Sequence, residues 1–86
     1  MTGPKSVPPL IDISVDFMDL ADGRLWVRPD DVRPDFLVQV GRHAIVGDDG
    51  AMPRVARITA VDDEGSIELE VLAGTVESHA VLLTSA

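Results

Sequence analysis

Apolar and polar residues alternate in several short stretches of the chain, and this pattern predicts strands. The first stretch covers residues 10–17, where isoleucine, valine and phenylalanine alternate with aspartate and serine. A period of two is typical of a strand with one buried and one exposed face. Residues 1–9 contain three prolines and a glycine, so we expect a flexible or extended tail before this strand.

A tight hairpin is predicted at Asp22-Gly23, because a type I′ turn needs positive φ at both central positions and this residue pair tolerates it. The strand after the turn then places alternate residues toward the core. The apolar residues before the turn match this register only if a bulge lies near Phe17–Met18. The pairs expected in this hairpin are Ala21 with Arg24, Leu20 with Leu25, and Met18 with Val27.

A second hairpin is predicted from two strands, residues 55–61 and 66–72, with an acidic turn between them. A loop of four residues pairs Val61 with Ser66. A slip by one residue would place glutamates in the core, so the hydrophobic pattern specifies the register. The expected pairs are Ala60 with Ile67, Ile58 with Leu69 and Ala56 with Val71 on the inner face, and Thr59 with Glu68 and Arg57 with Glu70 on the outer face.

The other segments are connections and further short strands. Residues 29–36 hold two prolines and three aspartates, which indicates a loop with at most one helical turn. Residues 36–47 resume the apolar pattern, with Gly41 at a turn or bulge. Residues 75–83 fit either a short helical turn or a last strand, and periodicity does not separate the two.

These elements predict an all-β fold, namely a small antiparallel barrel of five to six strands that occupies residues 10–86 behind the tail of residues 1–9. A chain of 86 residues buries only about 60% of its unfolded surface. Closing the sheet removes exposed edges, which a chain of this size needs.

The second half of the chain has an ordered series of motifs. Within residues 40–83, VGRHAIV is followed by an Asp-Gly turn, RVARITAV, a second acidic turn with glycine, and IELEVL. This series resembles Tudor domains and related SH3-like barrels, which implies an SH3-like fold. Tudor domains bind methylated side chains in an aromatic cage, but residues 40–86 contain no Phe, Trp or Tyr, so that function does not carry over. The whole chain also resembles short uncharacterised actinobacterial proteins, which offer no function to transfer and imply a bacterial origin.

The charge is strongly acidic and unevenly distributed. The formal net charge is -8, although residues 24–57 hold all six arginines against five aspartates. Nucleic-acid phosphates would be repelled except at a local arginine patch. An acidic surface favours solubility or a basic partner.

Composition excludes some chemistry and sets the expected location. The chain has no cysteine, which excludes disulfides and thiolate chemistry. The N-terminus shows no secretory signal and no apolar run is long enough to cross a membrane, so we expect a cytoplasmic protein. The hydrophobic fraction of 45% predicts apolar surface that a protein partner or a second copy covers, so a homo-oligomer is one expectation.

One candidate interaction surface is centred on Trp26. The predicted hairpin exposes Trp26 between Arg24 and Arg28, a composition typical of binding hot spots. The alternative is a Trp side chain that packs over one end of the barrel. Arg33 and Arg57 complete the candidate surface.

The arginines have two further interpretations. They form either one basic strip that holds phosphate or carboxylate groups, or separate ion pairs with neighbouring acids. The residues concerned are Arg24, Arg28, Arg33, Arg42, Arg54 and Arg57.

No catalytic, cofactor-binding or metal-binding residue is assigned. The acidic stretches at residues 48–50 and 62–65 lack EF-hand spacing and are explained by turn formation. His43 and His79, with Glu77, are either surface residues or a weak metal signal. No nucleophile has a visible base, and we expect little room for a ligand cavity of roughly several hundred Å³.

Three functions remain after these exclusions. The leading hypothesis is a non-enzymatic protein-interaction or self-assembly module without cofactor. The second is a nucleic-acid-binding barrel that uses the arginines of residues 24–57. The third is a subunit of an enzyme or ligand-binding assembly whose site is shared between chains.

Overall fold

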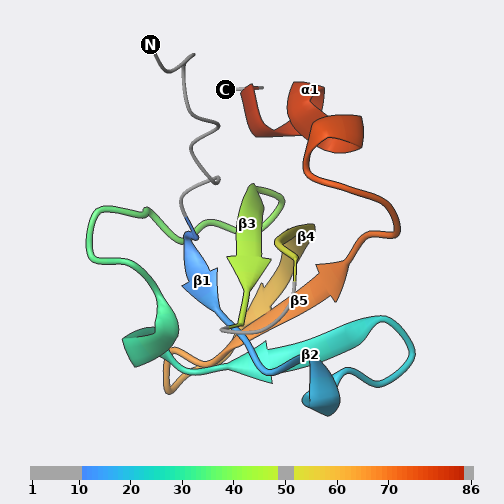
Figure 1. Cartoon of the computed structure of the whole chain (residues 1–86). Coiled ribbons are helices and arrows are strands. Elements are labelled where there is room, and N and C mark those ends of the chain that lie inside the picture. Colours follow the sequence, from blue (N-terminus) through green and yellow to red (C-terminus); the bar gives the residue numbers. More distant parts are fainter. Residues whose placement is uncertain (1–10, 49–51, 85–86) are drawn as a thin grey trace, which may run out of the picture.

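Five strands form one curled sheet in the computed structural model, which describes residues 11–48 and 52–84 (Figure 1). The predicted tail of residues 1–9 lies outside the described residues. The strand order in the sheet is β1-β3-β4-β5-β2. The strands are β1 (Ile13–Ser14), β2 (Arg24–Val27), β3 (His43–Gly47), β4 (Arg54–Val61) and β5 (Ile67–Val71).

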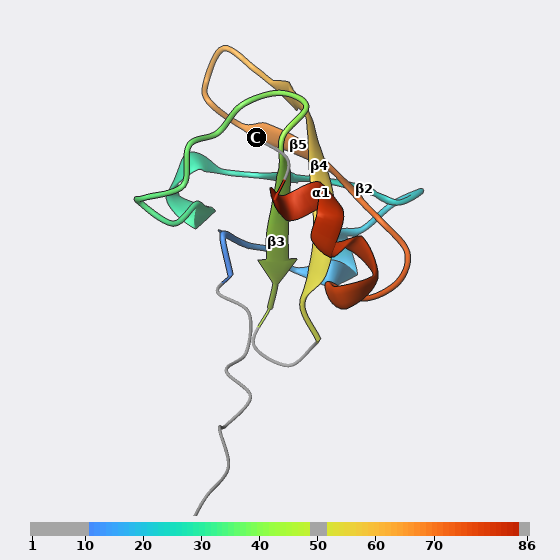
Figure 2. The same ribbon diagram turned by 90° about the horizontal axis from the view of Figure 1, so that it is seen from above.

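Helical segments are short and lie between or after the strands. Residues 75–83, which the sequence left open, are mostly helical, and the α-helix there lies beside β3 (Figure 2). Among the described residues, no helix has both the length and the apolar character needed to span a membrane. The segments are the 3-10 helices η1 (Phe17–Asp19), η2 (Pro29–Asp31) and η3 (Glu77–His79), and the α-helix α1 (Ala80–Thr84).

The predicted all-β class is confirmed, with five strands, but the sheet is mixed and not purely antiparallel. β1 runs parallel to β3, with Ile13 opposite Val46. Parallel strands need a long crossover connection, and the chain between β1 and β3 supplies it by passing through β2 and η2. The other three strand pairs are antiparallel.

The core lies on the concave face of this half-barrel. Alternate residues of β2 and β5 point inward, as the period of two predicts, whereas in β4 the adjacent residues Val55 and Ala56 are both buried. Phe36 adds an aromatic ring from the loop after η2. Burying these aliphatic side chains supplies the main driving force for folding. The core comprises Ile13, Val15, Leu25, Val27, Phe36, Ala44, Val46, Ala56, Ile58, Ile67, Leu69 and Val71.

One bridge joins the two edges of the sheet. After β2 and η2 the chain returns to β1, where Val32 pairs with Ile13 and the Arg33 amide donates to the Asp12 carbonyl at 2.7 Å. The Asp12 carboxylate accepts from Arg33 Nη2 at 2.7 Å and from the Ile45 amide at 3.0 Å. We call this set of contacts the seam, and it ties both edges of the sheet to β3.

The predicted turn at Asp22-Gly23 is confirmed, with φ values of 52° and 79° and a bridge between Ala21 and Arg24. The hairpin itself does not continue from this turn. β2 pairs with β5 instead, and the segment before the turn contains η1. The predicted pairs of Leu20 with Leu25 and of Met18 with Val27 are therefore wrong.

Local and long-range interactions explain this difference. Asp16 Oδ1 accepts from the Met18 amide at 2.9 Å and caps η1, which replaces the predicted bulge. Leu25 and Val27 face the core opposite two buried apolar residues of β5. A distant strand thus supplies the apolar partners that the segment before the turn does not.

The second predicted hairpin is confirmed in the half that lies away from its turn. Ile58 lies opposite Leu69, and the two neighbouring pairs of β4 and β5 are also as predicted. Beyond Ile58 a bulge shifts the register by one, so that Ala60 faces Glu68 and Val61 faces Ile67. Three predicted pairs are therefore wrong, namely Ala60 with Ile67, Thr59 with Glu68, and Val61 with Ser66. The bulge turns the side chain of Val61 to the same face as buried Ile67.

At the bulge, a polar side chain of β4 contacts β5. The Thr59 hydroxyl lies 2.9 Å from Glu68 Oε1 and 3.1 Å from the Glu68 carbonyl oxygen. The turn is closed by Asp62, whose Oδ1 accepts from the Glu64 amide at 3.0 Å and the Ser66 amide at 2.8 Å. These polar contacts accompany the extra residue in β4, and a pattern of apolar positions does not reveal them.

The seam makes stability depend on Asp12. We expect Asp12→Ala to lower the free energy of unfolding by about 2 kcal/mol, because it removes a charged hydrogen bond and leaves the Ile45 amide without its acceptor. Urea unfolding followed by circular dichroism measures this change. Asp35→Ala is the control, since Asp35 is 3.9 Å from Arg33 and its side chain is 89% exposed, and we expect a loss of about 0.5 kcal/mol or less. Equal losses in the two variants would contradict the role of the seam.

Candidate functional site

The outer face of β2 carries the Trp26 surface that the sequence predicted. Trp26 is 52% exposed and lies opposite Glu68, while Arg24 lies opposite Glu70. Arg57 of β4 reaches Glu70 at 3.4 Å. The structure therefore places Trp26 on a surface of mixed charge, where arginines and a glutamate alternate across three strands.

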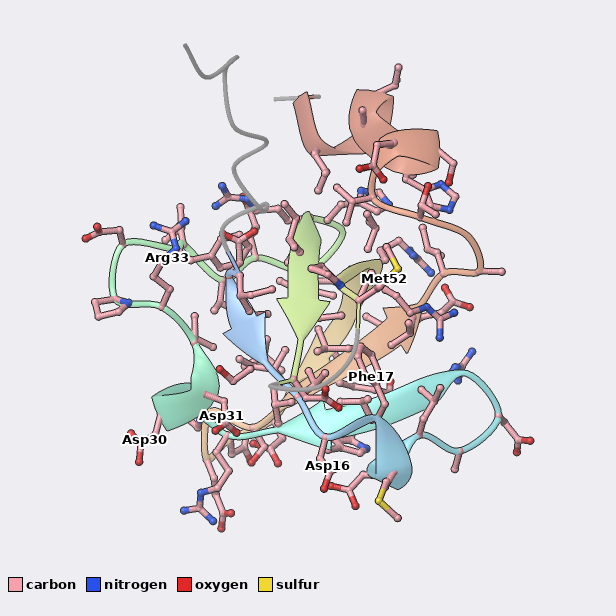
Figure 3. The ribbon with its side chains drawn as sticks, viewed as in Figure 1. Asp16, Phe17, Asp30, Asp31, Arg33 and Met52 are labelled. Carbon is pink, nitrogen blue, oxygen red and sulfur yellow. The ribbon has the colours of Figure 1, made fainter. Side chains whose placement is uncertain are left out.

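Only part of the predicted set gathers around Trp26. Arg24 and Arg57 share this outer face, and Arg28 follows Trp26 at the end of β2. Arg33 lies elsewhere, on the loop after η2 (Figure 3), where the seam holds its guanidinium against Asp12. Its contribution is to closure of the sheet and not to the Trp26 surface.

The other arginines have partners on separate elements and do not extend a strip. Arg42 Nη1 donates to the Leu37 carbonyl at 2.7 Å, and its guanidinium lies 4.2 Å from the Phe36 ring centroid. Arg54 Nη2 donates to the Leu72 carbonyl at 2.8 Å. Within the described part of the chain, these contacts commit four of the six arginines to positions that stabilise the fold, and Arg24 and Arg28 are the two exposed ones outside such contacts.

An open groove that the sequence did not predict lies at one end of the half-barrel. It has a volume of about 630 Å³ and forms where η2, the loop after it and the β4–β5 turn meet. The expectation of little room for a ligand is therefore wrong, because the space lies outside the packed core at an open end. The groove is lined by Pro29, Val32, Arg33, Pro34, Phe36, Val38, Gln39, Val40, Val61, Gly65 and Ile67.

The floor and the lips of the groove have different exposure. Ile67 and Phe36 are buried and form the floor, whereas Val40 is 60% exposed and Val61 is 43% exposed. A turn bond from the Phe36 amide to the Arg33 carbonyl at 2.9 Å fixes the loop that carries the aromatic ring. The groove thus has a firm base with two valine side chains open to solvent at its rim.

Two observations could have pointed to this groove in advance. The run FLVQV at residues 36–40 is more apolar than an ordinary loop. Val61 precedes an acidic turn, so a bulge that turns it inward also brings it to the end of the barrel. The bulge itself is a feature of the pairing of β4 with β5, so it is known only from the structure.

One end of the groove depends on a close contact between two turns. Gly65 has a φ of +85°, and a Cβ placed on it would lie 3.0 Å from Cγ of Pro29. The β4–β5 turn therefore packs directly on η2. This contact fixes the distance between two acidic stretches of the chain.

The contact predicts a difference between two glycine variants. Gly65→Ala and Gly23→Ala both place a side chain at positive φ, which costs about 1 to 2 kcal/mol. Gly65→Ala also pushes against Pro29, whereas no atom lies within 4 Å of a Cβ on Gly23. We expect the larger loss in urea unfolding for Gly65→Ala. Equal losses would show that η2 moves aside and does not fix the turn.

The histidines do not form a metal site. His79 Nε2 lies 2.6 Å from the Ala73 carbonyl oxygen, and His43 lies on β3 opposite Arg57. Among residues 11–48 and 52–84, no three histidine or carboxylate side chains come together as metal ligands. Most of the acidic stretch at residues 48–50 lies outside the described residues, while the stretch at 62–65 is a turn, as predicted.

The free edge of β2 is too short to receive another strand. The Val71 amide donates to the Gly23 carbonyl at 2.8 Å, and by the antiparallel alternation the backbone groups of Arg24 and Trp26 point to the open edge. The Arg24 amide already donates to the Ala21 carbonyl at 2.9 Å, and the Ala21 amide donates to the Arg24 carbonyl at 2.9 Å. Trp26 alone remains, which makes strand addition there unfavourable.

Comparison with known proteins gives no family for this chain: no family model, no curated protein and no solved structure matches it. Fold and site therefore define only a class. The chain is a small all-β protein whose five-stranded half-barrel carries an apolar groove at one open end.

Proposed function

We propose that this protein is a non-enzymatic protein-interaction module and that it binds its partner in the groove. The observation that carries the proposal is an apolar hollow with two exposed valine side chains at its rim. Concave apolar surface that remains open to water is typical of interaction sites. The chain has no cysteine, which suits a reducing compartment, so the proposal places it in the cytoplasm.

The lining of the groove favours a different kind of partner segment from the one that SH3 domains bind. The proposal retains the SH3-like resemblance for the barrel, but SH3 domains dock proline-rich segments in grooves lined by aromatic rings. Here a single ring, Phe36, lies among aliphatic side chains. Such a lining fits aliphatic side chains of a partner better than a polyproline helix.

The Trp26 surface is the second candidate for the same function. Trp26 is half exposed beside two arginines, and such side chains dominate many interfaces. It does not line the groove, and Trp26 and Arg24 face glutamates across the sheet. We therefore place the primary contact in the groove, and a selection experiment separates the two surfaces.

Peptides selected from a random display library on the full chain should bind the groove. We expect them to shift the backbone amide NMR signals of residues that line it. The double variant Val40→Ser/Val61→Ser should weaken their binding about 30-fold, because each valine contributes roughly 1 kcal/mol of apolar contact. Fluorescence anisotropy of a labelled selected peptide gives the affinity.

The matched control is Val81→Ser, the same exchange at a 77% exposed position on α1 that does not line the groove. It should leave peptide affinity unchanged. If Trp26→Ala abolishes binding while the valine variants do not, the binding surface is that of Trp26. If the library yields no enriched peptide, the proposed interaction function is wrong.

A further inference from the structure

Two acidic turns meet at one end of the groove. Pro29 and Gly65 both line it, and their close approach holds η2 against the β4–β5 turn. Figure 3 shows Asp30 and Asp31 on η2, beside the place where β4 and β5 are joined in Figure 1. We call the five carboxylates of these two turns the acidic end. They are Asp30, Asp31, Asp62, Asp63 and Glu64.

Two of these carboxylates are used by the fold and three are not. Asp31 Oδ2 accepts from the Arg28 amide at 3.0 Å, and Asp62 Oδ1 accepts from the turn amides. Asp30, Asp63 and Glu64 are exposed, and none of them forms an ion pair with the described residues. The acidic end therefore carries negative charge that the structure does not neutralise.

The arginines near the groove offset little of this charge. Arg28, which directly precedes η2, is exposed and brings one positive charge to the five carboxylates. Arg33 lines the groove, but Asp12 holds its guanidinium at 2.7 Å. Arg42 is turned onto Phe36 and the Leu37 carbonyl. The groove thus has an apolar floor and lips and a negative potential at one end.

The same charge argues against a second copy as the occupant. Each copy has a formal net charge of -8, and like charges across an interface are unfavourable. A second copy in the groove would bring another acidic surface to the acidic end. A segment with basic residues gains attraction at the same place, and the field of the whole chain steers it there.

We infer that the groove binds a linear segment of a partner protein in which aliphatic side chains are followed by lysine or arginine residues. This inference rests on the proposed function and adds the charge of the partner. The aliphatic side chains contact Val40, Val61 and Phe36. The basic side chains lie over Asp30, Asp63 and Glu64, where they remain partly in water.

Three synthetic capped peptides test the inference on the full chain. The first joins valine and leucine residues to lysine and arginine residues, the second has glutamate in place of each basic residue, and the third has serine. We expect the basic peptide to shift the amide signals of the groove most strongly. Its affinity should fall about tenfold between low salt and about 0.5 M salt, where exposed charges are screened.

Two charge-reversal variants locate the effect. Asp63→Lys/Glu64→Lys should weaken the basic peptide about tenfold and strengthen the acidic one, because it removes charge at the acidic end. Asp19→Lys/Glu77→Lys changes the net charge equally at exposed positions on η1 and η3, and it should change affinity less than threefold. Equal effects of both variants would reduce the attraction to net charge and overturn the inference.

The other outcomes separate this inference from the proposed function. If the neutral peptide binds as tightly as the basic one in the groove, the interaction function stands and the basic partner is wrong. If light scattering shows a dimer that Val40→Ser/Val61→Ser dissociates, a second copy is the occupant and the inference fails. If no peptide shifts any groove signal and the chain stays monomeric, both are overturned.

Discussion

The contact between Asp12 and Arg33 is the constraint on which the rest of the structure depends. β1 has only two residues in regular pairing and β2 has four, and two such short edges cannot hold a curled sheet together by strand pairing alone. The Asp12 carboxylate joins the Arg33 side chain to the amide of Ile45 in the neighbouring strand. Because this carboxylate is only 13% exposed, water competes weakly for its bonds.

The seam also creates the groove. Val32 and Arg33 pair with β1 and at the same time form part of the groove wall. After Arg33 the chain continues through Phe36, whose ring belongs to the core, and Val38, which packs against the core. Closure of the sheet and formation of the groove therefore depend on the same contacts, and we expect a variant that opens the seam to remove both.

The groove and the Trp26 surface differ in how they can bind. The groove is an apolar hollow with exposed carboxylates at one end, and under the proposed function it combines affinity from burial with selection by charge. On the Trp26 surface, Arg24 and Arg57 lie opposite Glu70, and Trp26 lies opposite Glu68. This surface can enlarge an interface that starts in the groove, since β2 leads directly into η2.

The sequence by itself determined the class of fold and much of the local structure. Alternation identified most of the buried residues of the strands, although it missed Val55 and wrongly included Ala60. Asp22-Gly23 identified a turn with two positive φ values. For Trp26 the sequence left two positions open, and the structure shows the exposed one. The alternation and the turn depend on residues close together in the chain, so a pattern of neighbours is sufficient to predict them.

Only the tertiary structure decided which strands are neighbours and where the candidate site lies. The parallel pairing of β1 with β3, the partner of β2 and the seam join residues far apart in sequence, and no local pattern specifies them. The bulge after Ile58 depends on the Thr59 and Asp62 side chains and moves Val61 to the groove. The groove is built from three separate segments, so it exists only once these long-range contacts bring them together.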